Sequence, residues 1–285
     1  MAYYTSVLAT WTDLMSCLDL RLLPSPPRDP TSAPLDGSAC VFEGSNQRLP
    51  HQRLFGGQLL GQFVRAASLI RPDKSVKSLH VLFVREGKSD VPLHYTVEPE
   101  HDGRSFATLT MTARQRGRTI ATCMASLHSA EDGREHQSAR AAVPMPGPQS
   151  RVHLDLLPWE TRSVTDLDDP AAQPAEYELW MRTPGAGNVL GPALIAYATD
   201  LNVVGTALRP LDGFDHRGNG TAFTSASTSH TVWFHRPFDT EDWLLLRHFG
   251  TVIAHGRCFG RGDVLTADGA LVASFAQEAL LRFHQ

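Results

Sequence analysis

Asp200 is the residue whose chemistry stands out, because it lies in a stretch that has no polar face. The segment Gly191–Leu208, GPALIAYATDLNVVGTAL, is predicted to be helical, and its apolar residues point in every direction around the helix. Such a helix is buried or crosses a membrane, and Thr199, Asp200 and Asn202 interrupt this one, which favours burial. A buried ionised carboxylate is costly unless it is paired or hydrogen-bonded. Asp200 is therefore either a structural residue that binds a strand or caps a break in the helix, or a general base in a dry site.

Two long apolar helices, each followed by strands, are predicted to organise the chain. The first lies within Leu54–Ile70 and begins near a Gly-Gly pair, and the second spans Leu190–Leu208. Segments rich in β-branched and aromatic residues follow each helix, at 78–84, 94–98, 105–116 and 119–128, and again at 222–234, 243–254, 257–266 and 270–282. A further helix is predicted at Thr12–Leu23, followed by an extended Pro-rich loop at 24–34. The sequence thus predicts an α+β fold in which antiparallel sheets wrap central helices.

The two halves of the chain repeat three short motifs in the same order. HVLFVR at 80–85 resembles HTVWFHR at 230–236, DGRSF at 102–106 resembles HGRCF at 255–259, and MASL at 124–127 resembles VASF at 272–275. The offset is roughly 150 residues, about half the chain, which indicates two fused copies of one domain. We expect an N-terminal domain at 1–130, a linker at 131–175 and a C-terminal domain at 176–285.

Composition excludes several classes of protein. The chain has 285 residues, 42% hydrophobic and 20% charged residues and a net charge of −4, which is typical of a globular protein and offers no basic patch for nucleic acid or an anionic membrane. The four cysteines are far apart and, with the histidines, form no metal-binding spacing, so we expect no metal, no cofactor and a reducing compartment. No secretory signal is evident, and we expect a cytoplasmic protein.

Several motifs together resemble one known family. RLFGGQLLGQ, SLHVLFVREG and DGRSF are similar to the first half of the type II acyl-CoA thioesterases, a family that includes bacterial thioesterase II and the peroxisomal long-chain enzymes. AYATDLN, HTVWFHRPF and DVLTADGALVASFAQEALLR are similar to its second half. The resemblance covers about Leu54 to Arg282. It implies a tandem double hotdog fold and a hydrolase of fatty acid metabolism whose substrate is an acyl-CoA.

The resemblance also implies a trio of catalytic residues. The family's Asp on the second central helix, its Ser or Thr before the WFHRPF motif and its Gln in the last strand correspond to Asp200, Ser227 and Gln277. Asp200 would accept a proton from water, while Ser227 and Gln277 would orient that water by hydrogen bonds. The first helix carries Gln58 and Gln62 but no Asp, so we expect the first half to be catalytically silent.

The position of the remaining polar residues bears on this assignment. Ser227 is not in a G-x-S-x-G elbow, and His230 follows it at an odd spacing, which on a regular strand turns His230 to the opposite face. We therefore expect Ser227 to orient water rather than to be a nucleophile. A helix N-terminus, at Gly56-Gly57 or at Gly191, would supply the backbone N–H groups for the oxyanion.

Three other functions stay open at this point. A hotdog hydratase would need a His five residues after the Asp, where this chain has Gly205. A biosynthetic thioesterase would release a product bound to an acyl carrier, and a non-hydrolytic hotdog protein would only bind the thioester. We also expect a homo-oligomer, because hotdog sheets leave edges that pair.

Overall fold

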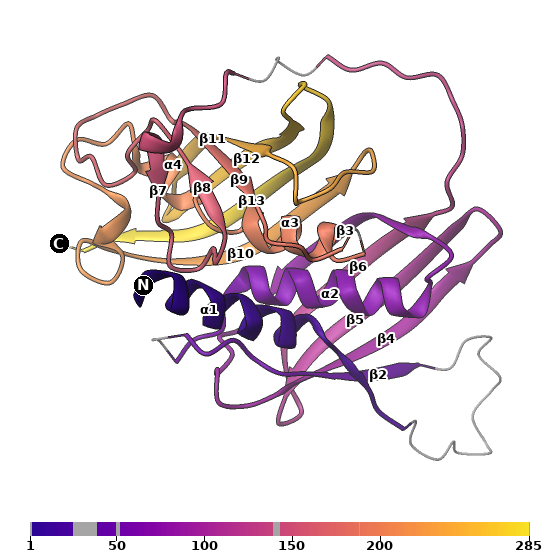
Figure 1. Cartoon of the computed structure of the whole chain (residues 1–285). Coiled ribbons are helices and arrows are strands. Elements are labelled where there is room, and N and C mark those ends of the chain that lie inside the picture. Colours follow the sequence, from indigo (N-terminus) through magenta and orange to yellow (C-terminus); the bar gives the residue numbers. More distant parts are fainter. Residues whose placement is uncertain (1, 25–38, 50–51, 139–142, 188, 285) are drawn as a thin grey trace. The chain divides into compact units, whose positions relative to one another are not determined.

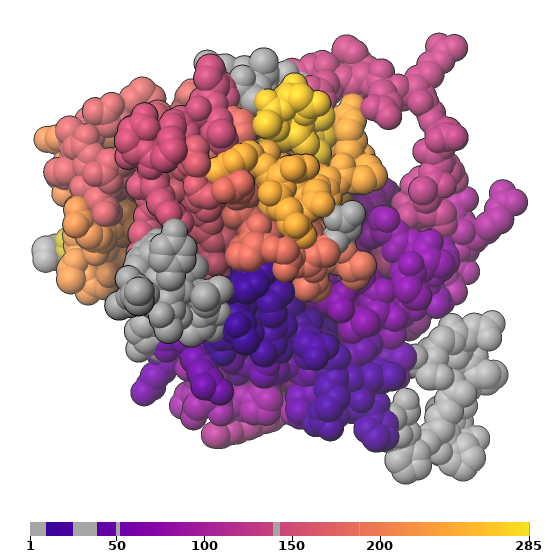
Figure 2. Space-filling view, viewed as in Figure 1, coloured from indigo at the N-terminus to yellow at the C-terminus, as the bar shows by residue number. Residues whose placement is uncertain are grey.

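The computed structural model describes residues 2–24, 39–49, 52–138, 143–187 and 189–284 (Figure 1). The chain divides into two compact units, Met1–Gly133 and Arg134–Gln285. The predicted Pro-rich loop lies outside the described residues except for Pro24. The side chains of residues 131–138 are exposed and stand out from the surface in Figure 2. The predicted domain and linker boundaries stay predictions.

The first unit is a helix packed on an antiparallel sheet. Its strands lie in the order β1-β2-β4-β5-β6-β3, and α2 lies along one face of them (Figure 1). The elements are α1 (Ala2–Leu18), β1 (Arg21–Leu22), β2 (Cys40–Gly44), α2 (Gly56–Ile70), β3 (Ser75–Phe83), β4 (Leu93–Asp102), β5 (Phe106–Gln115) and β6 (Arg118–His128).

The second unit repeats this plan with a longer sheet. Its strands lie in the order β10-β13-β12-β11-β9-β8-β7, all antiparallel. The elements are β7 (Arg151–Val152), β8 (Glu160–Arg162), β9 (Glu176–Arg182), α3 (Gly191–Thr199), α4 (Val203–Leu208), β10 (Phe223–Phe234), β11 (Leu244–Ala254), β12 (Arg257–Thr266) and β13 (Leu271–Phe283), with short 3₁₀ turns η1 (Pro148–Ser150) and η2 (His216–Gly218).

A shared strand order relates the two units. The order β2-β4-β5-β6-β3 in the first corresponds to β9-β11-β12-β13-β10 in the second, and in both the helical segment follows the first of these strands along the chain. An internal duplication requires such a match. The α+β class and the eight strands predicted after the two helices are confirmed, whereas the sequence interpretation missed β9 and the short strands β7 and β8.

Two helix predictions are wrong in part. The helix expected at Leu190–Leu208 is broken into α3 and α4, with Asp200 as the C-cap of the first and Asn202 as the N-cap of the second. The helix expected at Thr12–Leu23 ends at Leu18, because Arg21 and Leu22 pair with β2 and the Arg21 guanidinium binds Glu43 at 2.6 Å. In each case a contact or a polar side chain ends a helix that the apolar period would extend.

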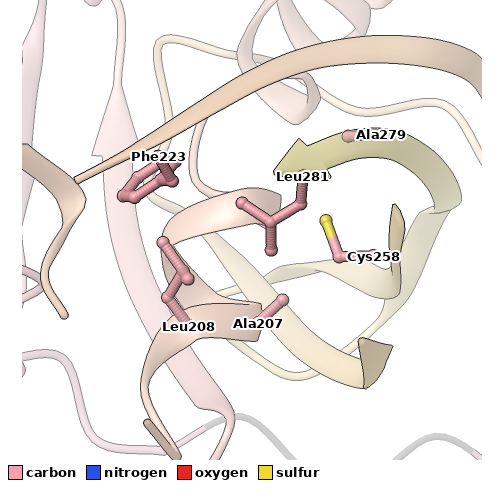
Figure 3. Packing of buried hydrophobic residues seen from close by; sticks show 6 residues of the cluster. All are labelled: Ala207, Leu208, Phe223, Cys258, Ala279 and Leu281. Atoms are coloured by element: carbon pink, nitrogen blue, oxygen red, sulfur yellow. The ribbon is translucent and has the colours of Figure 1, made fainter. Parts of the chain in front are cut away.

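Helix α4 packs closely on its sheet because two facing strands carry glycine. A Cβ atom at Gly250 of β11 would lie 2.6 Å from the Cα of Ala207, and one at Gly260 of β12 would lie 2.7 Å from the Val203 side chain. Close approach buries a small apolar cluster between α4 and strands β10, β12 and β13 (Figure 3), made of Ala207, Leu208, Phe223, Cys258, Ala279 and Leu281. The position of α4 is thus fixed immediately after the break that contains Asp200.

We predict that Gly250→Ala destabilises the protein by about 1–3 kcal/mol, because the added methyl group meets the backbone of α4, which cannot move aside as a side chain would. Gly133→Ala is the matched control, since a Cβ atom there meets nothing within 4 Å. Urea denaturation of both variants measures the difference. Equal stability of Gly250→Ala and the unmodified chain would contradict the close packing of α4.

Candidate active site

Asp200 lies at the break between α3 and α4. Its backbone dihedral angles are φ −75° and ψ −21°, and the residue is 8% exposed. The end of a helix carries partial negative charge from its unpaired carbonyl groups, so α3 gives the carboxylate no stabilisation. The side chain must therefore obtain its hydrogen bonds from elsewhere in the unit.

Ser227 of β10 supplies one such hydrogen bond. Its hydroxyl donates to Asp200 Oδ1 over 2.9 Å. Strand β10 carries a β-bulge at this point, because Ser227 pairs with Ala279 while Ser229 pairs with the adjacent Glu278. Thr228 is the extra residue, and bulges of this kind re-aim the side chains beside them.

Gln277 of β13 extends the network. Its Nε2 donates to Ser227 Oγ over 3.0 Å, and the residue is 1% exposed. The side chains of β13 alternate here, because Phe275, Gln277 and Ala279 are buried on one face while Ala276 and Glu278 on the other are only partly buried. The structure thus brings together the three side chains that the sequence selected, in the order Asp200, Ser227, Gln277.

His230 is a member of this network that sequence reasoning missed. Its Nδ1 lies 2.7 Å from Gln277 Oε1 and its Nε2 lies 3.0 Å from Thr199 Oγ1. The expectation that His230 faces away from Ser227 is wrong, because the bulge adds one residue and returns both side chains to the same face. The five residues at 225–229 are all small, so no apolar pattern fixes the register of this strand. This lack of a pattern was the sequence signal that a bulge was possible here.

Burial keeps the imidazole of His230 neutral. The residue is fully buried, and this desolvation lowers its pKa to about 4, although the hydrogen bond to Gln277 acts in the opposite direction. Burial also lowers the pKa of His248 on β11 to about 4. Both rings contact Phe275, with ring centroids 6.1 Å away for His230 and 5.1 Å away for His248.

The corresponding helix of the first unit carries amides that bind both backbone groups and neighbouring side chains. Gln62 Nε2 donates to the carbonyl oxygens of Cys17 and Ser45 at 2.8 Å each, and Gln62 Oε1 accepts from the Tyr95 hydroxyl at 2.6 Å. Gln58 Oε1 accepts from the backbone N–H of Gln47 over 3.0 Å. These amides hold β2 and the loop after it against α2.

Within the described part of the chain, no group of three or more His, Cys, Asp or Glu side chains is arranged to hold a metal ion. None of the described helices is long and apolar enough to cross a membrane. The glycines considered for the oxyanion do lie at helix N-termini, Gly56 as the first residue of α2 and Gly191 as the first of α3. Neither helix has a side-chain cap there, so the role of these N–H groups stays a prediction.

Comparison with known proteins gives consistent matches. Residues 46–128 match the family model described as the acyl-CoA thioesterase N-terminal domain, and residues 130–281 match the acyl-CoA thioesterase C-terminal domain. Acyl-CoA thioesterase 2 of Haemophilus influenzae is 31% identical over 271 residues, which cover 86% of this chain and 93% of that protein.

Solved structures agree with these matches. The crystal structure of acyl-CoA thioesterase II TesB2 from Mycobacterium marinum aligns with a TM-score of 0.74 and 29% identity, and the alignment covers 95% of this chain and 98% of that one. A protein with hot dog fold from Alicyclobacillus acidocaldarius aligns with a TM-score of 0.70 and 20% identity, covering 95% of this chain and 98% of that one, and shows likeness of fold alone. The predicted tandem hotdog fold is confirmed.

We predict that acid weakens the fold through its buried histidines. Because burial lowers the pKa of His230 and of His248 to about 4, the unfolded chain binds protons that the folded chain rejects between pH 6.5 and pH 4. The free energy of unfolding falls with decreasing pH across this window, by at most about 1.4 kcal/mol per pH unit for each histidine. Above pH 6.5 the two histidines no longer make the free energy of unfolding depend on pH.

Urea denaturation between about pH 4.5 and pH 7.5 measures this dependence. His248→Leu removes one titrating ring, so its stability curve should be shallower in the acid part of the range. A slope identical to that of the unmodified chain would show that the ring of His248 does not titrate on unfolding.

Proposed function

The chain belongs to the acyl-CoA thioesterase family and is a thioester hydrolase, and we propose that it hydrolyses acyl-CoA thioesters to the free acid and CoA with Asp200 as the general base. The observation that carries this proposal is the hydrogen-bonded series of Asp200, Ser227 and Gln277, which links the broken central helix to β10 and β13. The domains expected at 1–130 and 176–285, joined by residues 131–175, form part of the same proposal.

The proposed reaction is attack of water on the thioester carbonyl. Asp200 accepts a proton while the water oxygen bonds to the carbonyl carbon, and the carbonyl electrons move to the oxygen. When the tetrahedral intermediate collapses, the C–S bond breaks and CoA leaves as the thiolate. Asp200 then releases its proton. General-base help of this kind contributes about 10²–10⁴-fold to the rate, and fixing the water in place lowers the entropic cost of the attack.

Ser227 and Gln277 are proposed to orient the carboxylate and the water. The Ser227 hydroxyl donates a hydrogen bond to Asp200 and accepts one from the Gln277 amide. A hydroxyl so held fixes the rotation of the carboxylate, and it also leaves its oxygen engaged rather than poised for attack. Nucleophilic serines are often activated by an adjacent general base such as an imidazole, and the imidazole of His230 binds Gln277.

The first unit is proposed to be a catalytically silent scaffold. In place of a carboxylate, α2 carries Gln58 and Gln62, whose amides are engaged with backbone groups and Tyr95. A side chain that is held by several buried partners cannot turn toward a substrate without losing them.

The setting of the enzyme is proposed from its sequence. We place it in the fatty acid metabolism of the cytoplasm and expect it to be a homo-oligomer. All four cysteines are free, which suits a reducing compartment.

We predict that Asp200→Asn lowers kcat on any cleaved acyl-CoA by at least about 100-fold, because the amide has nearly the shape of the carboxylate but cannot accept the proton. The measurement is thiol release from a panel of acyl-CoAs. Asp155→Asn, an exposed change in the same unit, is the matched control and should keep full activity. A fully active Asp200→Asn enzyme would exclude Asp200 as the base.

Two further outcomes of the same assay concern the unmodified chain. Absence of thiol release at every acyl-chain length would favour a binding protein. Comparison with the same acyl groups on a carrier protein identifies the preferred thioester.

We predict that Ser227→Thr keeps kcat within about fivefold, whereas Ser227→Ala lowers kcat about 10- to 100-fold without abolishing turnover. The proposed role needs a hydroxyl that donates and accepts hydrogen bonds. It does not need the oxygen to form a bond to the thioester carbon. Rapid quenching of the unmodified enzyme during turnover, followed by mass spectrometry, should detect no acyl group on Ser227. A trapped acyl-serine would replace the water mechanism with covalent catalysis.

A further inference from the structure

The hydrogen bonds around Gln277 continue beyond the proposed trio and return to the central helix. Gln277 Oε1 lies 2.7 Å from His230 Nδ1, and His230 Nε2 lies 3.0 Å from the hydroxyl of Thr199. Thr199 is the residue that precedes Asp200. The side chains therefore form a closed series that starts at Asp200 and ends at its neighbour in sequence.

The donors and acceptors in this series can be arranged in one consistent way when Asp200 is ionised. A carboxylate only accepts, so Ser227 uses its single proton for Asp200 and must itself accept a hydrogen bond. The Gln277 amide provides that bond only when its nitrogen faces Ser227, which turns its carbonyl oxygen toward His230. That oxygen needs a donor, and Nδ1 of His230 therefore carries the proton.

The other side of the imidazole fits this arrangement. A neutral ring has one N–H, so Nε2 is then an acceptor. The Thr199 hydroxyl lies 3.0 Å from Nε2 and 2.9 Å from the Ala196 carbonyl oxygen, and in this arrangement its single proton is shared with Nε2 rather than given to Ala196 alone. The low pKa of His230, about 4, keeps the ring neutral. With the proton on Nε2 instead, two lone pairs would face each other at Gln277 Oε1. The Gln277 amide would then have to rotate and turn its oxygen toward Ser227. The Ser227 hydroxyl would donate its hydrogen bond to that oxygen, and Asp200 would lose the hydroxyl as a donor.

We propose that His230 is a positioning residue of the thioesterase site, which as the Nδ1–H tautomer holds the Gln277 amide in the orientation that makes Ser227 a donor to Asp200. This inference rests on the proposed function of Asp200. His230 acts through Gln277 and Ser227 and does not itself exchange a proton with the substrate. The bulge at Thr228 is what brings its ring to the site.

Two substitutions separate the hydrogen bond from the volume of the ring. His230→Leu removes the donor, and we expect kcat to fall about 10- to 100-fold, the loss that one buried hydrogen bond causes. KM should change by less than about threefold, because the proposed role gives the ring no contact with the substrate. His230→Asn places an amide N–H near the position of Nδ1, and we expect it to recover at least half of the lost activity on a logarithmic scale.

His248→Leu is the matched control for loss of a buried ring. His248 is also buried, also contacts Phe275 and also has a pKa of about 4. Within the described residues its ring makes no hydrogen bond to another side chain. The kcat of the His248→Leu enzyme should equal that of the unmodified enzyme. If His248→Leu loses as much activity as His230→Leu, or if His230→Asn recovers none, the effect is one of packing and the proposal is overturned.

The tautomer itself provides a test that does not depend on turnover. In protein labelled with ¹⁵N at histidine, long-range proton–nitrogen correlation spectra distinguish Nδ1–H from Nε2–H, and comparison with His230→Asn identifies the signals of His230. We expect Nδ1–H at pH 7, and Nε2–H would overturn the proposal. Full activity of Asp200→Asn would remove Asp200 as the base and leave the tautomer result unchanged, so the two failures can be distinguished.

Discussion

A carboxylate that lies at the end of a buried helix needs hydrogen-bond donors from the structure around it. Asp200 is in this position, since its own helix ends at Thr199 with the partial negative charge of its carbonyl groups. Ser227 donates to it, and the donation depends on the amide of Gln277 and, beyond that, on the proton of His230. The geometry of the site therefore follows from the requirement that every buried polar group in the series be satisfied.

The two units show what the same fold does with and without a carboxylate. In the first unit the helix is continuous from Gly56 to Ile70, and its glutamines bind backbone groups and the side chains of Asn46 and Tyr95. In the second unit the helix is broken, and Thr199 and Asp200 at the break bind His230 and Ser227 of β10. The duplicated strand order is common to both. A carboxylate at this position is therefore not a requirement of the fold, which favours a chemical role for Asp200.

Much of the fold could be predicted from the sequence, because apolar periods and turn residues report directly on strands and helices. Arg116-Gly117 and His255-Gly256, for example, adopt positive φ at both residues, as two-residue hairpin turns require. A break at Asp200 was only one of several alternatives for this residue, since the apolar residues continue on both sides of it. His230 was missed for a related reason. Assigning a side chain to a face of a strand by its spacing assumes that successive side chains point to opposite faces. One unpaired residue at the bulge breaks this alternation, so the assignment for His230 was wrong.

The bulge also explains how a single strand can supply two members of the site. In a regular strand, residues on one face are separated by two positions, and their side chains stand well apart along the strand. Thr228 adds one position between Ser227 and His230 and leaves both side chains against Gln277, which pairs with His230 across the ladder. Gln277 is thereby held at both ends of its amide, by a hydroxyl and by an imidazole. An amide fixed at both ends cannot rotate to exchange its nitrogen and oxygen, and this rigidity gives Asp200 a constant donor.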